Sequence, residues 1–174
     1  DNAPPTNQTE VKMLFDESNL YLLAICYDEP DYVIQTLKRD NFGSSDEFAV
    51  MFDPIGNKSN GFSVGVNAMG AQSEVVLSPG VVDFTWDNRW YSAVGRYPDR
   101  WIVEMKIPLK SLRYNENNTK WRVNFGRIDP GHNENSVWAA VPRQFGFEDI
   151  GFYGTLKWPQ APEKLGGNIS LIPY

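Results

Sequence analysis

Two tryptophans stand in a polar, turn-rich stretch of the chain, where an aromatic face could stay reachable. Trp86 and Trp90 lie in the segment 83–90, among aspartate, asparagine and arginine side chains. An indole face can pack against the C–H face of a sugar ring, while polar neighbours such as Asn88 and Arg89 can hydrogen bond to its hydroxyl groups. The pattern indicates sugar binding. The alternative is that these rings pin a loop onto the core, and Trp90 favours it because an alternating strand pattern begins there.

Carboxylates near the ends of expected strands form a second set of candidates. Asp28 follows one expected strand and Asp46 precedes another. Hard cations take several oxygen ligands at once, often from loop carboxylates. Both acids are therefore candidate metal ligands, although the sequence has no contiguous calcium-binding loop. The alternative is that they are solvated turn residues.

Catalytic motifs are absent from the sequence. The one histidine, His132, stands in a turn, and there is no nucleophile elbow, phosphate-binding loop or pair of metal-binding histidines. A glycosidase needs two carboxylates facing one cleft, and the sequence does not show that Glu47 and Glu104 converge. The one cysteine, Cys26, excludes an internal disulfide and a cysteine-based zinc cluster. We therefore expect a protein that is not an enzyme.

Composition limits the classes of partner. The chain has 174 residues, of which 41% are hydrophobic, so it is long and apolar enough for one domain with a real core. The net charge is −6 and no basic run occurs, which argues against nucleic acid and against anionic membrane surfaces. No stretch approaches the roughly 20 apolar residues that span a bilayer.

The hydrophobic pattern is almost entirely that of strands. Short alternating runs separated by turn signals, with no long helix, predict an all-β fold: an antiparallel, jelly-roll-like sandwich of about nine or ten strands. One helical turn is expected at 108–112, where proline takes the first position. The predicted strands are 11–15, 20–27, 47–52, 61–67, 72–77, 90–96, 101–107, 121–127 and 154–158. We expect the sandwich to occupy residues 1–158, and 159–174 to be a linker and the start of a truncated following segment.

An ordered set of short motifs runs through residues 9–158. Its members are Thr9–Lys12, Phe15–Tyr21, Tyr27–Asp28, Ser45–Phe48, Phe52–Pro54, Phe62–Asn67, Trp101–Leu112 and Trp121–Arg127. In this order they resemble carbohydrate-binding module family 9 and its wider relatives. The resemblance implies a β-sandwich that binds poly- or oligosaccharide without catalysis, and it makes a structural calcium ion near Asp28 an expectation.

The resemblance also singles out one tryptophan. The family places a ring-clamping tryptophan shortly before the last strand, and Trp138 matches that position. Glu134, Arg143 and Gln144 lie nearby in the sequence and could hydrogen bond to sugar hydroxyls. Trp138 is therefore the foremost stacking candidate, ahead of Trp86.

The same resemblance has a departure that keeps a second function open. The family's sugar-binding polar positions fall at or near Ala49, Gly65 and Gly126, which offer no side-chain hydrogen bond. The alternative is a structural or interaction domain that kept the fold without sugar binding. The loop tryptophans favour sugar binding, and the three small residues favour the accessory role.

A wider context is implied as well. Asn133-Glu134 before Trp138, with the expected strand start at 169–174, resembles modules that precede an outer-membrane β-barrel in bacterial surface proteins. That resemblance implies an extracellular, periplasmic or outer-membrane-associated location. It also implies a monomeric domain within a larger multidomain protein.

Overall fold

The computed structural model describes residues 3–29, 32–34, 36–41 and 44–163. The strand start expected at 169–174, and most of the expected linker, lie outside the described residues. In the part of the chain that is described, no helix has the length and apolar character needed to cross a membrane.

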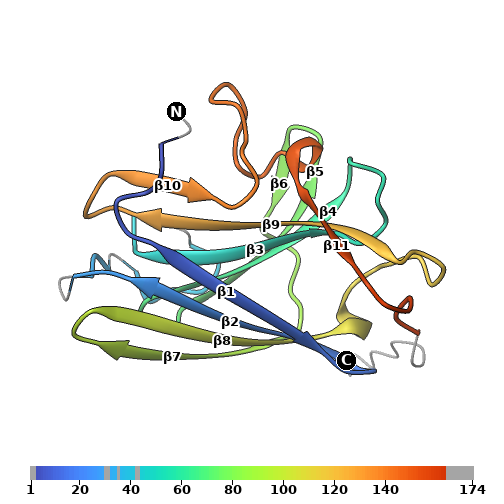
Figure 1. The fold of residues 1–174 in the computed structure, drawn as a ribbon, viewed down its shortest axis with the longest axis horizontal. Helices are drawn as coiled ribbons and strands as arrows, with labels where there is room; N and C mark the ends of the chain where they lie inside the picture. Colours follow the sequence, from blue (N-terminus) through green and yellow to red (C-terminus); the bar gives the residue numbers. More distant parts are fainter. Residues whose placement is uncertain (1–2, 30–31, 35, 42–43, 164–174) are drawn as a thin grey trace, which may run out of the picture.

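Two antiparallel sheets pack face to face (Figure 1), which confirms the predicted all-β sandwich. The small sheet has the order β1-β2-β8-β7, formed by Thr9–Phe15, Asn19–Tyr27, Arg100–Pro108 and Tyr91–Tyr97. The large sheet has the order β10-β9-β3-β4-β5-β6, formed by Glu134–Val137, Lys120–Asp129, Glu47–Asp53, Gly61–Asn67, Gln72–Ser78 and Val81–Asp83. An eleventh strand, β11 (Gly154–Lys157), also pairs with β9.

Three pairs of predicted strands form antiparallel hairpins: β1 with β2, β4 with β5, and β7 with β8. The helical turn expected after β8 is present as η1 (Leu109–Ser111). The sequence pattern missed the short strands β6 and β10 and the turn η2 (Ile150–Phe152), because three or four residues carry too little periodicity to stand out.

The core lies between the sheets and contains several tryptophans. Trp101 and Trp121 are fully buried, and Trp158 packs edge-on against Trp121 with ring centroids 4.8 Å apart. Cys26 is buried in the same cluster.

Strand β3 is buried on both of its faces. Residues 48, 50 and 52 face the core between the sheets, yet Glu47, Ala49 and Met51 are buried as well. In an antiparallel sandwich one face of such a strand usually meets solvent. The outer face of the large sheet must therefore be covered, and this cover forms the site described below.

Two connections provide that cover. The first joins β5 through β6 to β7 and carries Phe84. The second, residues 138–153, leaves β10 and returns as β11 to the same edge of β9: Val137 pairs with Gly126, and Gly154 pairs with Val123. We call this second connection the return loop.

Candidate functional site

A row of small residues forms the floor of the site on the outer face of the large sheet. Ala49 of β3 lies opposite Gly126 of β9 on one side and Gly65 of β4 on the other, and Gly65 lies opposite Ser73 of β5. Side chains at cross-strand positions share one face of a sheet, so four neighbouring positions leave a shallow trough.

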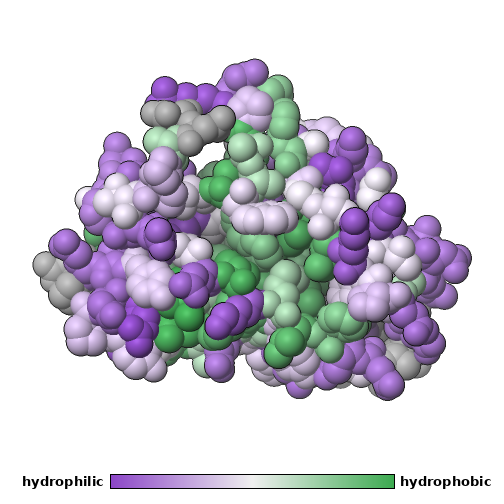
Figure 2. Space-filling model, in the orientation of Figure 1, coloured by the Kyte–Doolittle hydropathy of each residue, from purple (hydrophilic) through white to green (hydrophobic). Residues whose placement is uncertain are grey.

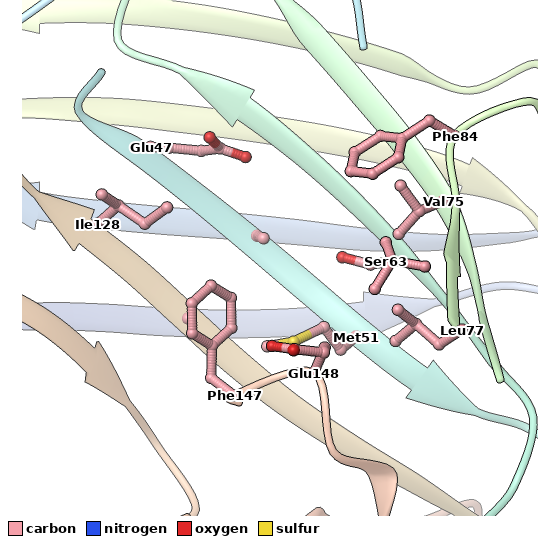
Figure 3. A pocket seen from close by; sticks show the side chains of 12 residues that line it. Glu47, Met51, Ser63, Val75, Leu77, Phe84, Ile128, Phe147 and Glu148 are labelled. Carbon is pink, nitrogen blue, oxygen red and sulfur yellow. The ribbon is translucent and has the colours of Figure 1, made fainter. Parts of the chain in front are cut away.

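Aromatic side chains stand on opposite sides of this floor (Figure 3). Phe84 is 45% exposed and follows β6, while Phe147 comes from the return loop. The cavity between them measures about 290 Å³. We call it the sheet pocket; its lining is Glu47, Ala49, Met51, Ser63, Val75, Leu77, Val82, Phe84, Gly126, Ile128, Phe147 and Glu148.

Phe147 is held in place by the glycine below it and by the anchored loop around it. A Cβ atom at Gly126 would lie 3.5 Å from the Phe147 ring, so the ring lies close over this position of β9. Asn124 accepts a hydrogen bond from the Ala139 N–H at 2.8 Å and donates one to the Ala139 carbonyl at 3.0 Å. The Tyr153 hydroxyl donates to the Glu148 carbonyl at 3.0 Å. The Asn124 bonds fix the start of the return loop against β9, and the Tyr153 bond holds the end of the loop to the residue after Phe147.

The connection that carries Phe84 is anchored by a buried carboxylate on β5. Glu74 is fully buried and accepts hydrogen bonds from the Trp90 indole N–H at 3.2 Å and from the Asn88 backbone N–H at 3.3 Å. Arg39 forms an ion pair with the same carboxylate. The two connections thus position Phe84 and Phe147 from separate parts of the sequence.

The polar groups of the sheet pocket are few. Among the described lining residues they are Glu47, Ser63 and Glu148, and the first two are 3% and 5% exposed. Burial raises the pKa of Glu47 to about 8, against a weaker opposing effect of the Ser73 hydroxyl, whose oxygen lies 3.4 Å from the carboxylate. Glu47 is therefore mainly protonated at neutral pH and can donate a hydrogen bond.

Trp138 lies outside the sheet pocket, on a second depression that we call the side groove. This groove runs between β1 and the β9–β10 edge, has a volume of about 520 Å³, and is lined among others by Thr9, Ser136 and Trp138. In Figure 2 apolar residues gather in the middle of the face over β1, β3 and β9, with hydrophilic residues around them. Trp138 is 61% exposed, so one indole face is available to a ligand.

The Trp138 ring depends on a glycine beneath it. A Cβ atom at Gly154 would overlap the ring, and the Phe125 ring lies 5.7 Å away at 59°. We expect Gly154→Ala to displace the indole and to cost about 1 kcal/mol through overpacking. The displaced indole should change the tryptophan fluorescence spectrum of Gly154→Ala. This change should be absent when Gly154→Ala is added to Trp138→Phe, which lacks the indole. An unchanged wild-type spectrum in Gly154→Ala would show that the ring does not rest there.

The structure gives the segment 83–90 a different role from the one expected. Trp90 is 5% exposed and bonded to Glu74, which is the core alternative that the sequence left open. Trp86 is half-buried and packs against Phe62 of the core at 4.9 Å. Neither ring lines the sheet pocket or the side groove.

The polar residues of that segment form hydrogen bonds that hold the loop in place. The Asn88 side chain donates to the Ser111 carbonyl at 2.6 Å and accepts from the Arg89 N–H at 2.7 Å. The Arg89 side chain is exposed, while its carbonyl accepts from the Ser111 hydroxyl at 3.1 Å. These contacts tie the loop to η1, so Asn88 fixes the position of the chain that follows Phe84.

The polar residues expected beside Trp138 are dispersed. Both carboxylate oxygens of Glu134 accept hydrogen bonds from Thr6, at 2.6 and 2.9 Å, and these bonds lower the pKa of Glu134. Arg143 and Gln144 are exposed on the return loop, and Gln144 lines a depression next to Phe145. The structure therefore does not gather the expected polar residues around the Trp138 indole.

The expected metal ligands belong to a buried ion-pair cluster. The Arg127 guanidinium lies 2.6 Å from Asp28 and 3.5 Å from Asp129, and Asn7 donates to both carboxylates at 3.2 and 3.1 Å. His132 adds a third potential ligand, since one atom each from Asp28, Asp129 and His132 lie within 4.8 Å of one another. A calcium ion here would meet the arginine charge that already neutralises the two acids. This donor set does not fit a calcium site.

Asp46 does not complete a cation site either. One carboxylate oxygen accepts the Val33 N–H at 2.6 Å, and the other has no partner among the described residues. Burial raises its pKa to about 6, and the charges of Asp28 and Asp129 add to this rise. Arg127 is the positive charge that acts on Asp46, and it already pairs with Asp28 and Asp129. We therefore assign these acids and Arg127 a structural role.

These features define a β-sandwich domain with a ligand-sized pocket on one sheet. The chain belongs to the carbohydrate family 9 binding domain-like family, whose model matches residues 2–158. This confirms the family resemblance. A search of curated proteins finds no match.

Solved structures show the same fold. A carbohydrate-binding module of family 9 from Caldicellulosiruptor kristjanssonii, in complex with glucose, superposes with a TM-score of 0.67 at 16% identity, covering 94% of this chain and 83% of that one. The same description with cellotriose gives 0.64 at 16% identity, covering 99% and 84%. A putative carbohydrate-binding protein from Bacteroides uniformis gives 0.72 at 11% identity, covering 87% and 78%.

Sequence reasoning missed Phe84, Phe147 and the role of Glu47. One signal was available: the run Phe48–Phe52 is apolar at every position, and such a run predicts a strand covered on both faces. Glu47 precedes this run, so its burial was foreseeable once the outer face was known to be covered.

Proposed function

We propose that this domain binds carbohydrate without catalysis, and that the sheet pocket holds one sugar ring between Phe84 and Phe147. The observation that carries the proposal is the pair of aromatic rings on opposite sides of a floor of small residues. Aromatic side chains pack on the C–H faces of a sugar ring, and the bare floor leaves room for the ring between them. Family membership supports the same ligand class.

Trp138 is our second stacking position. Its exposed indole and the hydroxyls of Thr9 and Ser136 border the side groove, which could take a further sugar ring of the same chain. The sheet pocket is favoured because two rings flank it, whereas the described residues place one exposed indole on the groove. Affinity should be modest, because exchanging hydrogen bonds with water leaves little net gain per contact.

The surroundings of the domain are part of this proposal. The similarity to modules that precede an outer-membrane barrel supports an extracellular, periplasmic or outer-membrane-associated location within a larger protein. In that setting, the binding module would hold the rest of the protein close to its polysaccharide.

A glycan array followed by calorimetry on the best glycan tests the function and separates the two positions. We expect Phe147→Ala to weaken binding about fivefold, equivalent to roughly 1 kcal/mol of lost stacking. Trp138→Ala, the matched aromatic control, should weaken it less if the sheet pocket is the principal site.

Two outcomes would contradict this proposal. A larger loss in Trp138→Ala than in Phe147→Ala would move the principal site to the side groove. A folded protein that binds none of the glycans would leave the accessory-domain alternative, a sandwich that kept the family fold without the sugar site. Thermal unfolding of each variant shows that it is folded.

A further inference from the structure

The sheet pocket is unusually apolar for a site that would hold a bare sugar. Apart from Glu47, Ser63 and Glu148, its described lining consists of aliphatic, aromatic, methionine and glycine residues. A hydroxyl group that enters such a pocket loses its water and needs a new partner. A sugar ring carries hydroxyls around most of its edge, so a ring without apolar substituents would leave several of them unpaired against Val75 and Leu77.

One chemical group matches the floor better. We propose that the sugar bound in this pocket carries an acyl group, such as N-acetyl or O-acetyl, whose methyl lies on the floor at Ala49 and whose carbonyl oxygen accepts a hydrogen bond from Glu47. This inference rests on the proposed function and names the substrate class of the same site. An acyl group pairs an apolar methyl with one acceptor, which is the combination that this corner of the pocket offers.

The position of Glu47 supports this assignment. Figure 3 shows its carboxyl group beside Ile128, at one end of the pocket, with Phe84 and Phe147 farther along. Glu47 lies two residues before Ala49 on β3, so both side chains point to the same face of the sheet and Glu47 borders the floor. Glu148 is exposed at the opposite end and is the other ionisable group among the described lining residues.

The protonation state of Glu47 makes the inference sensitive to pH. A buried carboxyl group with a pKa of about 8 keeps its proton below that pH and loses it above. Below pH 8 the group can donate to a carbonyl oxygen, and above it the carboxylate would repel the same oxygen. Acyl-sugar binding should therefore weaken as the pH rises through 8.

The test is a pair of β-1,4-linked trisaccharides, triacetylchitotriose and cellotriose, titrated calorimetrically at pH 6 and pH 9.5. They differ only at C2 of each ring, which carries an acetamido group in the first and a hydroxyl group in the second. We expect the acetylated sugar to bind at least tenfold more tightly at pH 6 and to lose most of this advantage at pH 9.5. Acetylated xylan and the same xylan after alkaline deacetylation repeat the comparison for O-acetyl groups. Improved binding of either acetylated ligand supports the inference.

Two variants sharpen the result. Glu47→Gln keeps a donor and the same shape, so it should keep the preference and lose the pH dependence. Ala49→Leu should fill the floor and abolish the preference, with thermal unfolding to show that the variant is folded. Equal or better binding of both unacetylated ligands, still weakened by Phe147→Ala, would overturn the acyl inference and leave sugar binding intact. No binding of any of the four ligands to the folded wild-type protein would overturn the acyl inference, while the full array decides the proposed function.

Discussion

Replacing Arg127 with methionine should lower the free energy of unfolding by about 3–5 kcal/mol, because it leaves buried carboxylates without their cation. The guanidinium is 2% exposed and lies 2.6 Å from Asp28, which is 9% exposed, and 3.5 Å from Asp129. It also donates to the Tyr27 carbonyl at 2.7 Å, which links the end of β2 to β9. Urea unfolding followed by tryptophan fluorescence measures the change.

A matched variant separates charge from geometry. Arg127→Lys keeps the charge but lacks the planar fork that contacts both Asp28 and Tyr27, so we expect an intermediate loss. Combining Arg127→Met with Asp28→Asn should recover part of the stability, since one uncompensated charge is removed. A loss below about 1 kcal/mol in Arg127→Met would mean that water or ions reach this cluster and screen it.

The second large effect is expected at Glu74, where Glu74→Ala should cost about 3 kcal/mol and also reduce ligand binding. The change leaves the buried Trp90 N–H and the Asn88 N–H without their acceptor, and each unsatisfied buried donor costs about 1–3 kcal/mol. Because these bonds hold the connection that carries Phe84, the wall of the sheet pocket should loosen as well. Urea unfolding measures the first effect and calorimetry with the best glycan the second.

Glu74→Gln is the control for this prediction. Its amide oxygen can still accept one hydrogen bond, while the ion pair with Arg39 is lost. Since the Arg39 side chain is 43% exposed, its charge can return to water at little cost. Glu74→Gln should therefore retain most of the binding; equal losses in both variants would point to the ion pair as the main stabilising contact.

The fold could be predicted from the sequence because its strands are long enough to show their period. Turns at Asp16–Asn19 and Ala68–Gly70 separate alternating runs, so the hairpins and their partners follow from neighbouring residues. Pairing between distant strands does not follow in this way. Nothing local in β9 shows that both β10 and β11 pair along it, so the return loop and its cover over the sheet stayed hidden.

The site was less predictable for a related reason. Aromatic residues in polar loops look alike in sequence, whether they turn inward like Trp90 or outward like Trp138. What separates these two is a distant partner: the Glu74 carboxylate for Trp90 and the bare Gly154 backbone for Trp138. Phe84 and Phe147 face the sheet pocket from connections that are far apart in the chain, so their placement also depends on distant partners.

The three small residues that the resemblance singled out lie side by side in the large sheet. The resemblance placed the family's sugar-binding positions at or near Ala49, Gly65 and Gly126, and these residues prove to be cross-strand neighbours in the structure. Their small size looked like a loss of function in the sequence. In the structure two of them, Ala49 and Gly126, line the space between the aromatic side chains.

The return loop can be varied in sequence and length without changing the sandwich that carries it. It leaves β10 opposite Gly126 of β9 and returns as β11 opposite Val123, so its two ends lie about 10 Å apart along the same strand. Loops closed over a short fixed span tolerate changes in length at a small entropic cost. A library that varies 140–148 between these two anchors would therefore sample new pocket walls on an unchanged sandwich, which is how antibody frameworks generate diversity.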